Sequence, residues 1–347
     1  MCADHLITGT GPLLDEAGRL REPGYALHPP FDYDHNRIAA PRWRIKDWDY
    51  YLINDDSFAV ALTLSDLGYI GLVSASVMDF GAGTFKTTSE LVPLPMGRIG
   101  LPTSSLTGDV TWRGRRTSAC FAHVPGGRRL SFSMTGFDKD EDLEVEFLLD
   151  REPRDSMVIC TPWVEDPKAF YYNRKVLGMR AQGGFRRGAQ VHVFCPEDSL
   201  GLLDWGRGVW TYDNVWYWAA AQGYQGDHLV AINLGYGFGD TSAASENMVF
   251  VDGIAHKLSR VDFGIPQNED GTFSYLEPWH MLDNEGRLDL VFTPQIDRTD
   301  NIDVAGVVQS TQHQVFGTLD GFVVLDDGAK LDICGLRGSS EHIHNRY

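Results

Sequence analysis

Residues 216–221 read WYWAAA and lead through an aliphatic run to Leu234-Gly235-Tyr236. An earlier stretch has the same order: WDYY at residues 48–51 precedes an aliphatic run and Leu67-Gly68-Tyr69. The tryptophan-to-leucine interval is 18 residues in the later copy (234 − 216) and 19 in the earlier one (67 − 48). Similarity within a chain at a fixed distance indicates a repeated structural unit. The sequence therefore predicts a diverged duplication of one β unit of about 165 residues.

Short strands are predicted along most of the chain. Apolar runs of four to eight residues, bounded by turn residues such as Pro125-Gly126-Gly127, recur at Phe58–Leu64, Leu130–Met134, Leu143–Leu149, Leu229–Leu234 and Leu288–Phe292. We predict an all-β fold in which two lipocalin-like antiparallel β-barrel halves pack in tandem, over residues 1–165 and 166–347. The second half carries the candidate site. One short helix is expected at Asp166–Leu177, after two prolines.

The composition indicates a folded protein and excludes several classes. Of 347 residues, 43% are hydrophobic and 22% are charged, which excludes disordered and coiled-coil chains. The net charge of −18 repels phosphate backbones, so we expect no nucleic-acid partner. There is no apolar run long enough to span a bilayer and no signal-peptide pattern. The odd number of cysteines, 5 in scattered positions, indicates reduced thiols and a cytoplasmic location.

Aromatic residues are concentrated in residues 203–221, LDWGRGVWTYDNVWYWAAA. Because a strand alternates its faces, Trp216 and Trp218 point to one side and Tyr217 to the other. Such indoles either fill a core or form a flat wall for a ligand. We therefore take Trp210, Trp216 and Trp218, with Trp48 of the first copy, as candidate ligand-binding residues.

Four charged residues in the second half are candidates for polar chemistry. Asp204 and Arg207 either lie in a solvated turn or form a pair at the mouth of a pocket, where the arginine would orient a polar group of the ligand. Glu246 and His256 flank a predicted hairpin. They are either ordinary polar residues of a hairpin or an acid/base pair. In the second reading, Asp204, Arg207, Glu246 and His256 converge on one pocket.

A glycine-rich segment follows the aromatic stretch. Gly235, Gly237 and Gly239 permit close approach of a ligand or of neighbouring backbone, which makes Asn233, Tyr236 and Asn247 candidate ligand contacts. Their GxGxG spacing differs from the GxGxxG of dinucleotide-binding turns, so no cofactor is predicted. His342 and His344 share a strand face but lack a third ligand with matching spacing, and no metal is predicted.

These same stretches resemble a bacterial family known as domain of unknown function 2804. The resemblance runs nearly end to end and is carried by residues 46–51, 204–210, 216–218, 233–239, 246–247 and 252–257. That family is similar to the carotenoid 1,2-hydratase and AttH-like group. The relationship implies a tandem lipocalin-like double barrel and, in some members, cofactor-independent chemistry on terpenoid or polyketide ligands. A fold resemblance alone does not establish a function.

Two functions fit these observations. The first is a cofactor-independent enzyme that acts by acid/base chemistry on a mostly apolar, polycyclic or glycosidic small molecule, through hydration, isomerisation, cyclisation or bond cleavage. The second is a non-catalytic cytosolic carrier for an apolar ligand. The residues assigned to catalysis in the first are Asp204, Glu246, His256 and Tyr217. The residues assigned to substrate binding are Trp48, Arg207, Trp210, Trp216, Trp218, Asn233, Tyr236 and Asn247.

Overall fold

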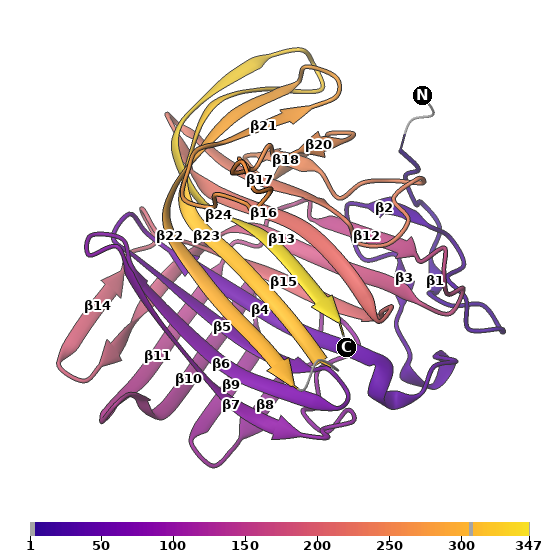
Figure 1. Cartoon of the computed structure of the whole chain (residues 1–347), viewed down its shortest axis with the longest axis horizontal. Helices are drawn as coiled ribbons and strands as arrows, with labels where there is room; N and C mark the ends of the chain where they lie inside the picture. The colour runs from indigo at the N-terminus through magenta and orange to yellow at the C-terminus, as the bar shows by residue number, and fades with distance from the viewer. Residues whose placement is uncertain (1–3, 305–307, 347) are drawn as a thin grey trace.

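A computed structural model describes residues 4–304 and 308–346, and almost all of the ordered secondary structure in them is β-strand. The helical elements of the described chain are two short 3-10 turns, η1 (His35–Arg37) and η2 (Arg42–Arg44). Within the described residues, no helix has the length and apolarity needed to cross a bilayer. The predicted all-β fold of two tandem lipocalin-like halves is confirmed, and both halves are curled antiparallel sheets (Figure 1).

The first sheet contains strands from residue 24 to residue 209. Its members are β2 (Gly24–Ala26), β4 (Ile45–Asn54), β5 (Phe58–Asp66), β6 (Ile70–Asp79), β7 (Thr84–Pro93), β8 (Val110–Arg113), β9 (Thr117–Val124), β10 (Gly127–Asp138), β11 (Glu141–Asp150), β12 (Met157–Pro162), β13 (Phe170–Arg187), β14 (Gln190–Phe194) and β15 (Leu200–Val209). A separate small sheet pairs β1 (Gly11–Pro12) with β3 (Phe31–Asp32).

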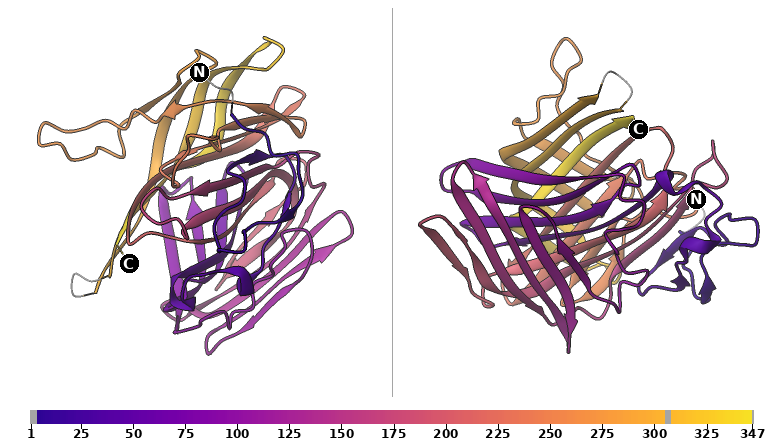
Figure 2. Two further views of the ribbon diagram at one scale, coloured as in Figure 1. Left: turned by 90° about the vertical axis from the view of Figure 1, so that its right-hand side faces the viewer. Right: turned by 90° about the horizontal axis from the view of Figure 1, so that it is seen from below.

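The second sheet contains the strands from residue 213 onward. Its members are β16 (Asp213–Gln225), β17 (His228–Tyr236), β18 (Met248–Val251), β19 (Ile254–Lys257), β20 (Val261–Asp262), β21 (Trp279–Asp283), β22 (Leu288–Val304), β23 (Val308–Val324) and β24 (Lys330–Arg346). The long strands β22–β24 extend beyond this sheet's own core and lie across β4–β7 of the first sheet (Figures 1 and 2).

The two sheets have the same connectivity around their first long strand. In the first, β4 starts the meander β4–β5–β6–β7 and pairs on its other edge with the last strand, β15. In the second, β16 starts β16–β17–β18–β19 and pairs with the last strand, β24. Trp48 and Trp216 are each the fourth residue of these first strands. The sequence repeat therefore corresponds to equivalent places in the two sheets.

The division between the sheets lies later in the chain than the predicted boundary. Strands β13, β14 and β15 follow residue 165 but belong to the first sheet. The division falls between Val209 and Asp213, so the boundary at residues 165 and 166 does not coincide with it. The helix expected at residues 166–177 is wrong. From Phe170 onward this segment is β13, and its first ten residues are all buried, which removes the alternation that marks a half-exposed strand.

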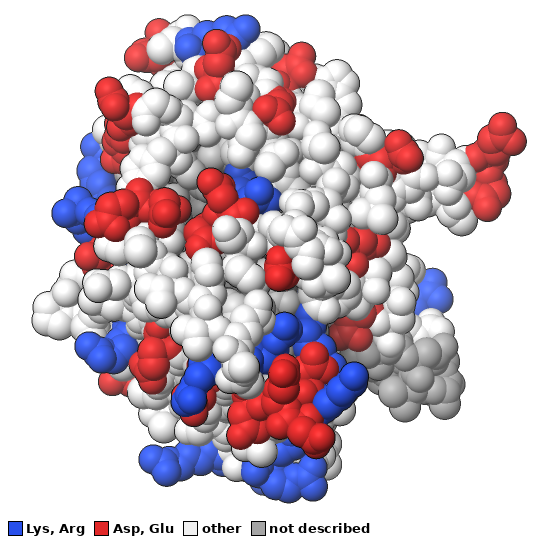
Figure 3. Space-filling model, turned by 90° about the vertical axis from the view of Figure 1, so that its left-hand side faces the viewer, with Lys and Arg blue, Asp and Glu red and all other residues white. Residues whose placement is uncertain are grey.

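The outer face of the first sheet and the long strands of the second enclose a space between them. In β4, the side chains of Tyr51 and Ile53 point into the core of the first half, where the Tyr51 and Phe121 ring centroids are 5.1 Å apart. Because strand side chains alternate, those of Lys46, Trp48 and Tyr50 point to the other half. On the face seen in Figure 3, acidic and basic side chains are mixed rather than separated into large patches.

Candidate active site

A cavity of about 710 Å³ lies between the two halves, lined by residues of both. Its first-sheet wall comes from β4–β7, β13 and β15, and its second-sheet wall from β16 and β22–β24. Six aromatic side chains cover one end: Trp48, Tyr171, Trp210, Trp216, Trp218 and Phe238. Mostly apolar cavities of this size, with a few converging polar groups, are the usual form of small-molecule sites. The predicted location in the second half alone is therefore wrong, because the first half supplies a full wall.

Trp210 organises the aromatic end of the cavity. Its ring centroid lies 5.1 Å from that of Trp216, 5.8 Å from Trp48 and 5.6 Å from Tyr171, with edge-to-face geometry in each pair. Trp48 lies flat against β15 because its register partner there is Gly206. A Cβ atom on that glycine would be 2.0 Å from the indole. The glycine in the Asp-Trp-Gly-Arg motif thus makes room for the tryptophan of the facing strand.

A pair of carboxyl groups lies in the cavity wall. Asp204 is buried on β15, and its Oδ1 accepts a hydrogen bond of 2.5 Å from Asn173 Nδ2. Glu341 is buried on β24, where its Oε1 accepts from Gln314 Nε2 at 2.5 Å and its Oε2 from Trp216 Nε1 at 3.4 Å.

The electrostatics of Glu341 differ from those of an ordinary glutamate. Burial raises the pKa of its carboxyl to about 7; nearby Arg298 opposes the shift and the Asp204 charge adds to it. A carboxylic acid with this pKa can donate or accept a proton near neutral pH, as a general acid or base must.

Lys175 forms a buried ion pair behind the aromatic wall. Its Nζ lies 3.1 Å from both carboxylate oxygens of Glu246 and 3.4 Å from the Tyr171 hydroxyl. The ammonium also lies 4.7 Å from the ring centroid of Trp218. Burial raises the pKa of Glu246, while the Lys175 charge lowers it. Gly235 makes the pair sterically feasible, since a Cβ there would be 2.0 Å from Glu246 Oε1.

The predicted site residues divide by location. Asp204, Trp48, Trp210, Trp216 and Trp218 line the cavity. Glu246 does not line it; its carboxylate reaches the cavity only through Lys175, which does.

Arg207 lies outside the cavity, so its predicted pairing with Asp204 is wrong. The two residues are three apart on β15, and an odd separation on a strand places side chains on opposite faces. Arg207 is fully buried in the first half, where its guanidinium bonds to Asp49 Oδ1 at 2.9 Å and to the Pro102 carbonyl at 2.8 Å. Arg207 therefore fixes the segment around Pro102.

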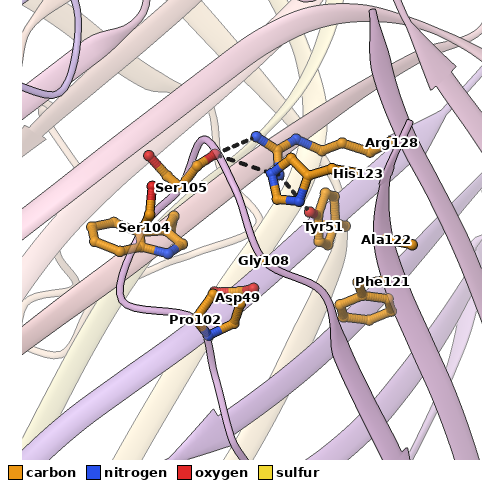
Figure 4. Close-up of a pocket in the computed structure, with 11 residues that line it drawn as sticks. Asp49, Tyr51, Pro102, Ser104, Ser105, Gly108, Phe121, Ala122, His123 and Arg128 are labelled. Carbon is orange, nitrogen blue, oxygen red and sulfur yellow. Dashed lines mark hydrogen bonds between the residues drawn. The ribbon is translucent and has the colours of Figure 1, made fainter. Parts of the chain in front are cut away.

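The interior of the first half holds almost no empty volume next to that segment. A hollow of about 10 Å³ lies among Asp49, Tyr51 and Arg128 (Figure 4), which is room for about one water molecule. Arg128 Nη2 donates to the Ser105 carbonyl at 2.7 Å and so holds the same segment from the other side. This part of the first half is thus filled with protein, whereas the cavity of about 710 Å³ lies between the halves.

Tyr217 and Tyr236 lie on the reverse face of the second sheet. The Tyr217 ring stacks on Tyr236 and on His342, with both centroid distances 4.5 Å. The alternation predicted for Trp216, Tyr217 and Trp218 is therefore observed, and it directs the tyrosine away from the cavity. The assignment of Tyr217 to catalysis and of Tyr236 to binding in this cavity does not fit that placement.

His256 also lies away from the cavity. On the edge strand β19 its register partner is Val249, and its Nδ1 is 3.5 Å from Asp326 Oδ2. The register of the β18–β19 hairpin sets Met248 opposite Lys257, so the predicted cross-hairpin pair of Glu246 and His256 does not form.

Asn233 and Asn247 support the wall from behind. Asn233 is fully buried; its Oδ1 accepts from Trp218 Nε1 at 2.8 Å and its Nδ2 donates to the Glu246 carbonyl at 2.8 Å. Asn247 Oδ1 accepts from the Gly235 amide at 2.7 Å. Both orient neighbours of the cavity, and neither is among its lining residues.

Sequence reasoning missed the residues whose significance depends on strand pairing. Lys175 lies within the segment expected to be helical, and Glu341 lies in a C-terminal stretch considered only for its histidines. In the structure Glu341 is the register partner of Trp218 on the neighbouring strand. Neighbouring residues on a strand face opposite sides, so Glu341 lies on the side of β24 opposite His342. That this is the side of Trp216 and Trp218 follows only from the pairing of β24 with β16, which the sequence does not reveal.

The described residues do not include a cluster of three or more His, Cys, Asp or Glu side chains arranged to hold a metal. His342 Nδ1 hydrogen-bonds the Tyr275 hydroxyl at 2.8 Å, and His344 Nε2 bonds Asp213 at 2.8 Å. The two histidines share a face of β24 but are directed to separate partners.

Sequence comparison decides the family. Residues 4–347 match the sequence profile of the family described as Domain of unknown function (DUF2804). The chain is a DUF2804 protein. No curated protein is significantly similar to it in sequence.

Solved structures resemble this DUF2804 chain in fold. A protein assigned as AttH from Nitrosomonas europaea superposes with a TM-score of 0.51 at 12% identity, over 92% of this chain and 98% of that one. Kievitone hydratase from Nectria haematococca superposes with a TM-score of 0.47 at 9% identity, over 87% of this chain and 88% of its own. The similarity to the first supports the same tandem architecture for the DUF2804 chain.

Proposed function

We propose that the protein is a cofactor-independent enzyme that performs acid/base chemistry on a mostly apolar small molecule in the cavity between its halves. The observation that carries the proposal is Glu341: a buried carboxyl with a pKa of about 7, in an aromatic cavity that also holds Asp204. Perturbed acids in clefts are common at catalytic sites. The proposal involves no metal, nucleic acid or membrane anchor, and it assumes a cytoplasmic protein.

The surroundings of Glu341 favour its protonated form near neutral pH. Burial and the Asp204 carboxylate raise the pKa of the Glu341 carboxyl, while the Arg298 and Lys175 cations oppose the shift without cancelling it. A buried carboxylate is costly unless it is compensated, so the neutral acid is retained to higher pH than in water. We assign the transferable proton to Glu341 on this basis.

The roles of the two carboxyl groups follow from their contacts. Gln314 and Trp216 both donate to Glu341, so its oxygens are held in place while its proton is given to a double bond or an oxygen of the ligand. Protonation leaves a positive charge on the ligand, and the Asp204 carboxylate then faces that positive centre. The indoles of Trp216 and Trp218 stabilise such a centre through their electron-rich faces. Asp204 then takes a proton from the water that adds to this centre or from the adjacent carbon, which completes a hydration or an isomerisation. Proton exchange with solvent returns Asp204 to the carboxylate and Glu341 to the acid before the next turnover.

The experiment uses the full-length protein and an extract of small molecules. Wild type, Glu341→Gln and Asp204→Asn would be incubated with the extract, and ligands retained on the protein and compounds changed in solution would be identified by mass spectrometry. We expect one compound to be converted by wild type, with a gain of water or no change in mass, and to remain bound but unconverted in both variants. A compound that all three proteins retain and none converts would indicate the carrier instead.

A further inference from the structure

The strand register shows how the cavity is arranged from its aromatic end to its opposite end. In the first sheet, Asp204 pairs with Tyr50, Tyr50 with Thr63, Thr63 with Ser74, and Ser74 with Ser89. Neighbouring strands are about 4.8 Å apart, so Ser74 lies about 14 Å from Asp204 along this row. The cavity therefore continues well beyond the carboxyl pair.

Hydroxyl groups line that far end on the first sheet. Thr63, Ser74, Thr87 and Ser89 all contribute to the cavity wall. Ser89 Oγ donates to Ser74 Oγ at 3.0 Å, and Thr87 Oγ1 is 2.8 Å from Ser76 Oγ. Each hydroxyl has one donor and two acceptor sites, so these pairs leave capacity for a ligand.

The second sheet places three planar polar side chains in the same part of the cavity. Arg298, Asp300 and Gln312 line it from β22 and β23. Arg298 Nη1 donates to Ser76 Oγ at 3.0 Å, which fixes the arginine beside the Ser76 and Thr87 pair, one row from Ser74 and Ser89. Its Nε is buried and has no hydrogen-bond partner among the described residues. A guanidinium, a carboxylate and an amide together can pair with adjacent hydroxyl groups of one ligand.

Apolar side chains lie beside these polar groups. One row away on the same strands, the register pair Leu72 and Leu91 is apolar and also lines the cavity. Together with Ile343 of the facing strand, these side chains would hold an apolar part of a ligand. A wholly apolar ligand would cover the half-buried hydroxyl groups of Ser74, Thr87 and Ser89 without offering them a hydrogen bond, and such burial is costly.

We infer that the cavity end formed by Ser74, Ser89, Arg298 and Asp300 is a subsite for a polyhydroxylated group, such as the sugar ring of a glycoside. The apolar, ring-containing part of the same ligand would then lie against Trp48 and Trp216. This inference rests on the proposed function, because it takes the aromatic end as the reacting end. It narrows the substrate class to elongated molecules with one apolar and one polyhydroxylated end.

The test compares two probes by isothermal titration calorimetry: naphthol, and naphthyl β-glucoside, which adds a sugar to the same ring system. We expect the glucoside to bind wild type about tenfold more tightly, as two neutral hydrogen bonds would provide. In Ser74→Ala/Ser89→Ala that advantage falls to about twofold or less, while naphthol binding stays unchanged. Thr84→Ala, at an exposed site on the same strand β7, is the matched control and keeps the full advantage.

Three results would overturn the subsite: equal binding of the two probes, no binding of either, or equal weakening of both in the serine variant. The same titrations with Glu341→Gln separate this inference from the proposed function. If the glucoside advantage persists there and no conversion of any compound depends on Glu341, the subsite stands and the acid/base proposal fails. If conversion of a compound depends on Glu341 but wild type binds the glucoside no more tightly than naphthol, the acid/base proposal stands and the subsite fails.

Discussion

The Lys175 ammonium lies 3.1 Å from both carboxylate oxygens of Glu246, and both side chains are almost completely buried. The pair joins β13 of the first sheet to the segment before β18 of the second. Because Lys175 lines the cavity and Glu246 does not, the glutamate acts by keeping a buried cation compensated. Its expected effect is therefore on the folded state rather than on proton transfer to a ligand.

We predict that Glu246→Leu alone destabilises the protein by about 3–5 kcal/mol, because it leaves the Lys175 charge buried without a partner. Lys175→Met alone should cost a similar amount. The double variant Lys175→Met/Glu246→Leu should cost clearly less than the sum of the two single changes. Urea unfolding of the four proteins measures this, and additive costs would mean that the pair is not coupled.

Arg207 provides a second stability prediction. Arg207→Met leaves Asp49 buried without its 2.9 Å partner and releases the Pro102 carbonyl, so we expect a loss of about 3–5 kcal/mol. The exposed pair of Arg186 and Glu144 is a matched control, since Arg186→Met should leave the denaturant midpoint nearly unchanged. Denaturant midpoints compare the two. An Arg207 variant as stable as the Arg186 variant would contradict the structural role assigned here.

Gly206→Ala tests how the aromatic end of the cavity is built. A Cβ at this position would lie 2.0 Å from the Trp48 indole, so the ring must move into the cavity. We expect a loss of about 1–3 kcal/mol from overpacking, together with a change in tryptophan fluorescence and weaker binding of aromatic ligands. Gly81→Ala is the matched control, because neither glycine has a positive φ and an added Cβ at Gly81 would meet its nearest neighbour, Asp79 Oδ1, only at 3.5 Å.

The sequence predicted the fold but only part of the site, and strand geometry explains both results. The repeated tryptophan motif is local in the chain, and it identified the first strands of both sheets. The site depends on pairings such as β16 with β24, which join Trp218 to Glu341 across more than a hundred residues. Asp204 and Arg207 show the opposite case, because residues close in sequence are separated by the alternation of one strand.

Glu341 gives a pH-dependent prediction that needs no substrate. Its pKa is about 7 in the folded protein and about 4.5 when unperturbed, so between these values the folded state binds more protons than the unfolded state. The contribution of this group to the free energy of unfolding therefore falls as pH rises from about 4.5 to about 7 and stays low above that. Glu341→Gln removes the titration, so the variant should gain stability relative to wild type across this window, by about 3 kcal/mol in all.

Urea unfolding of wild type and Glu341→Gln at pH values on either side of this window measures the difference. We expect the stability of the variant relative to wild type to increase between the acidic and the alkaline measurement. Glu269→Gln, at an exposed position, is the control and should show no such change, since an exposed carboxyl titrates alike in the folded and unfolded states. If the Glu341 variant behaves like the Glu269 variant, the Glu341 carboxyl is ionised at neutral pH in the folded protein. It would then have no proton to donate, and the assignment of Glu341 as general acid would fail even if ligands still bind against the tryptophans.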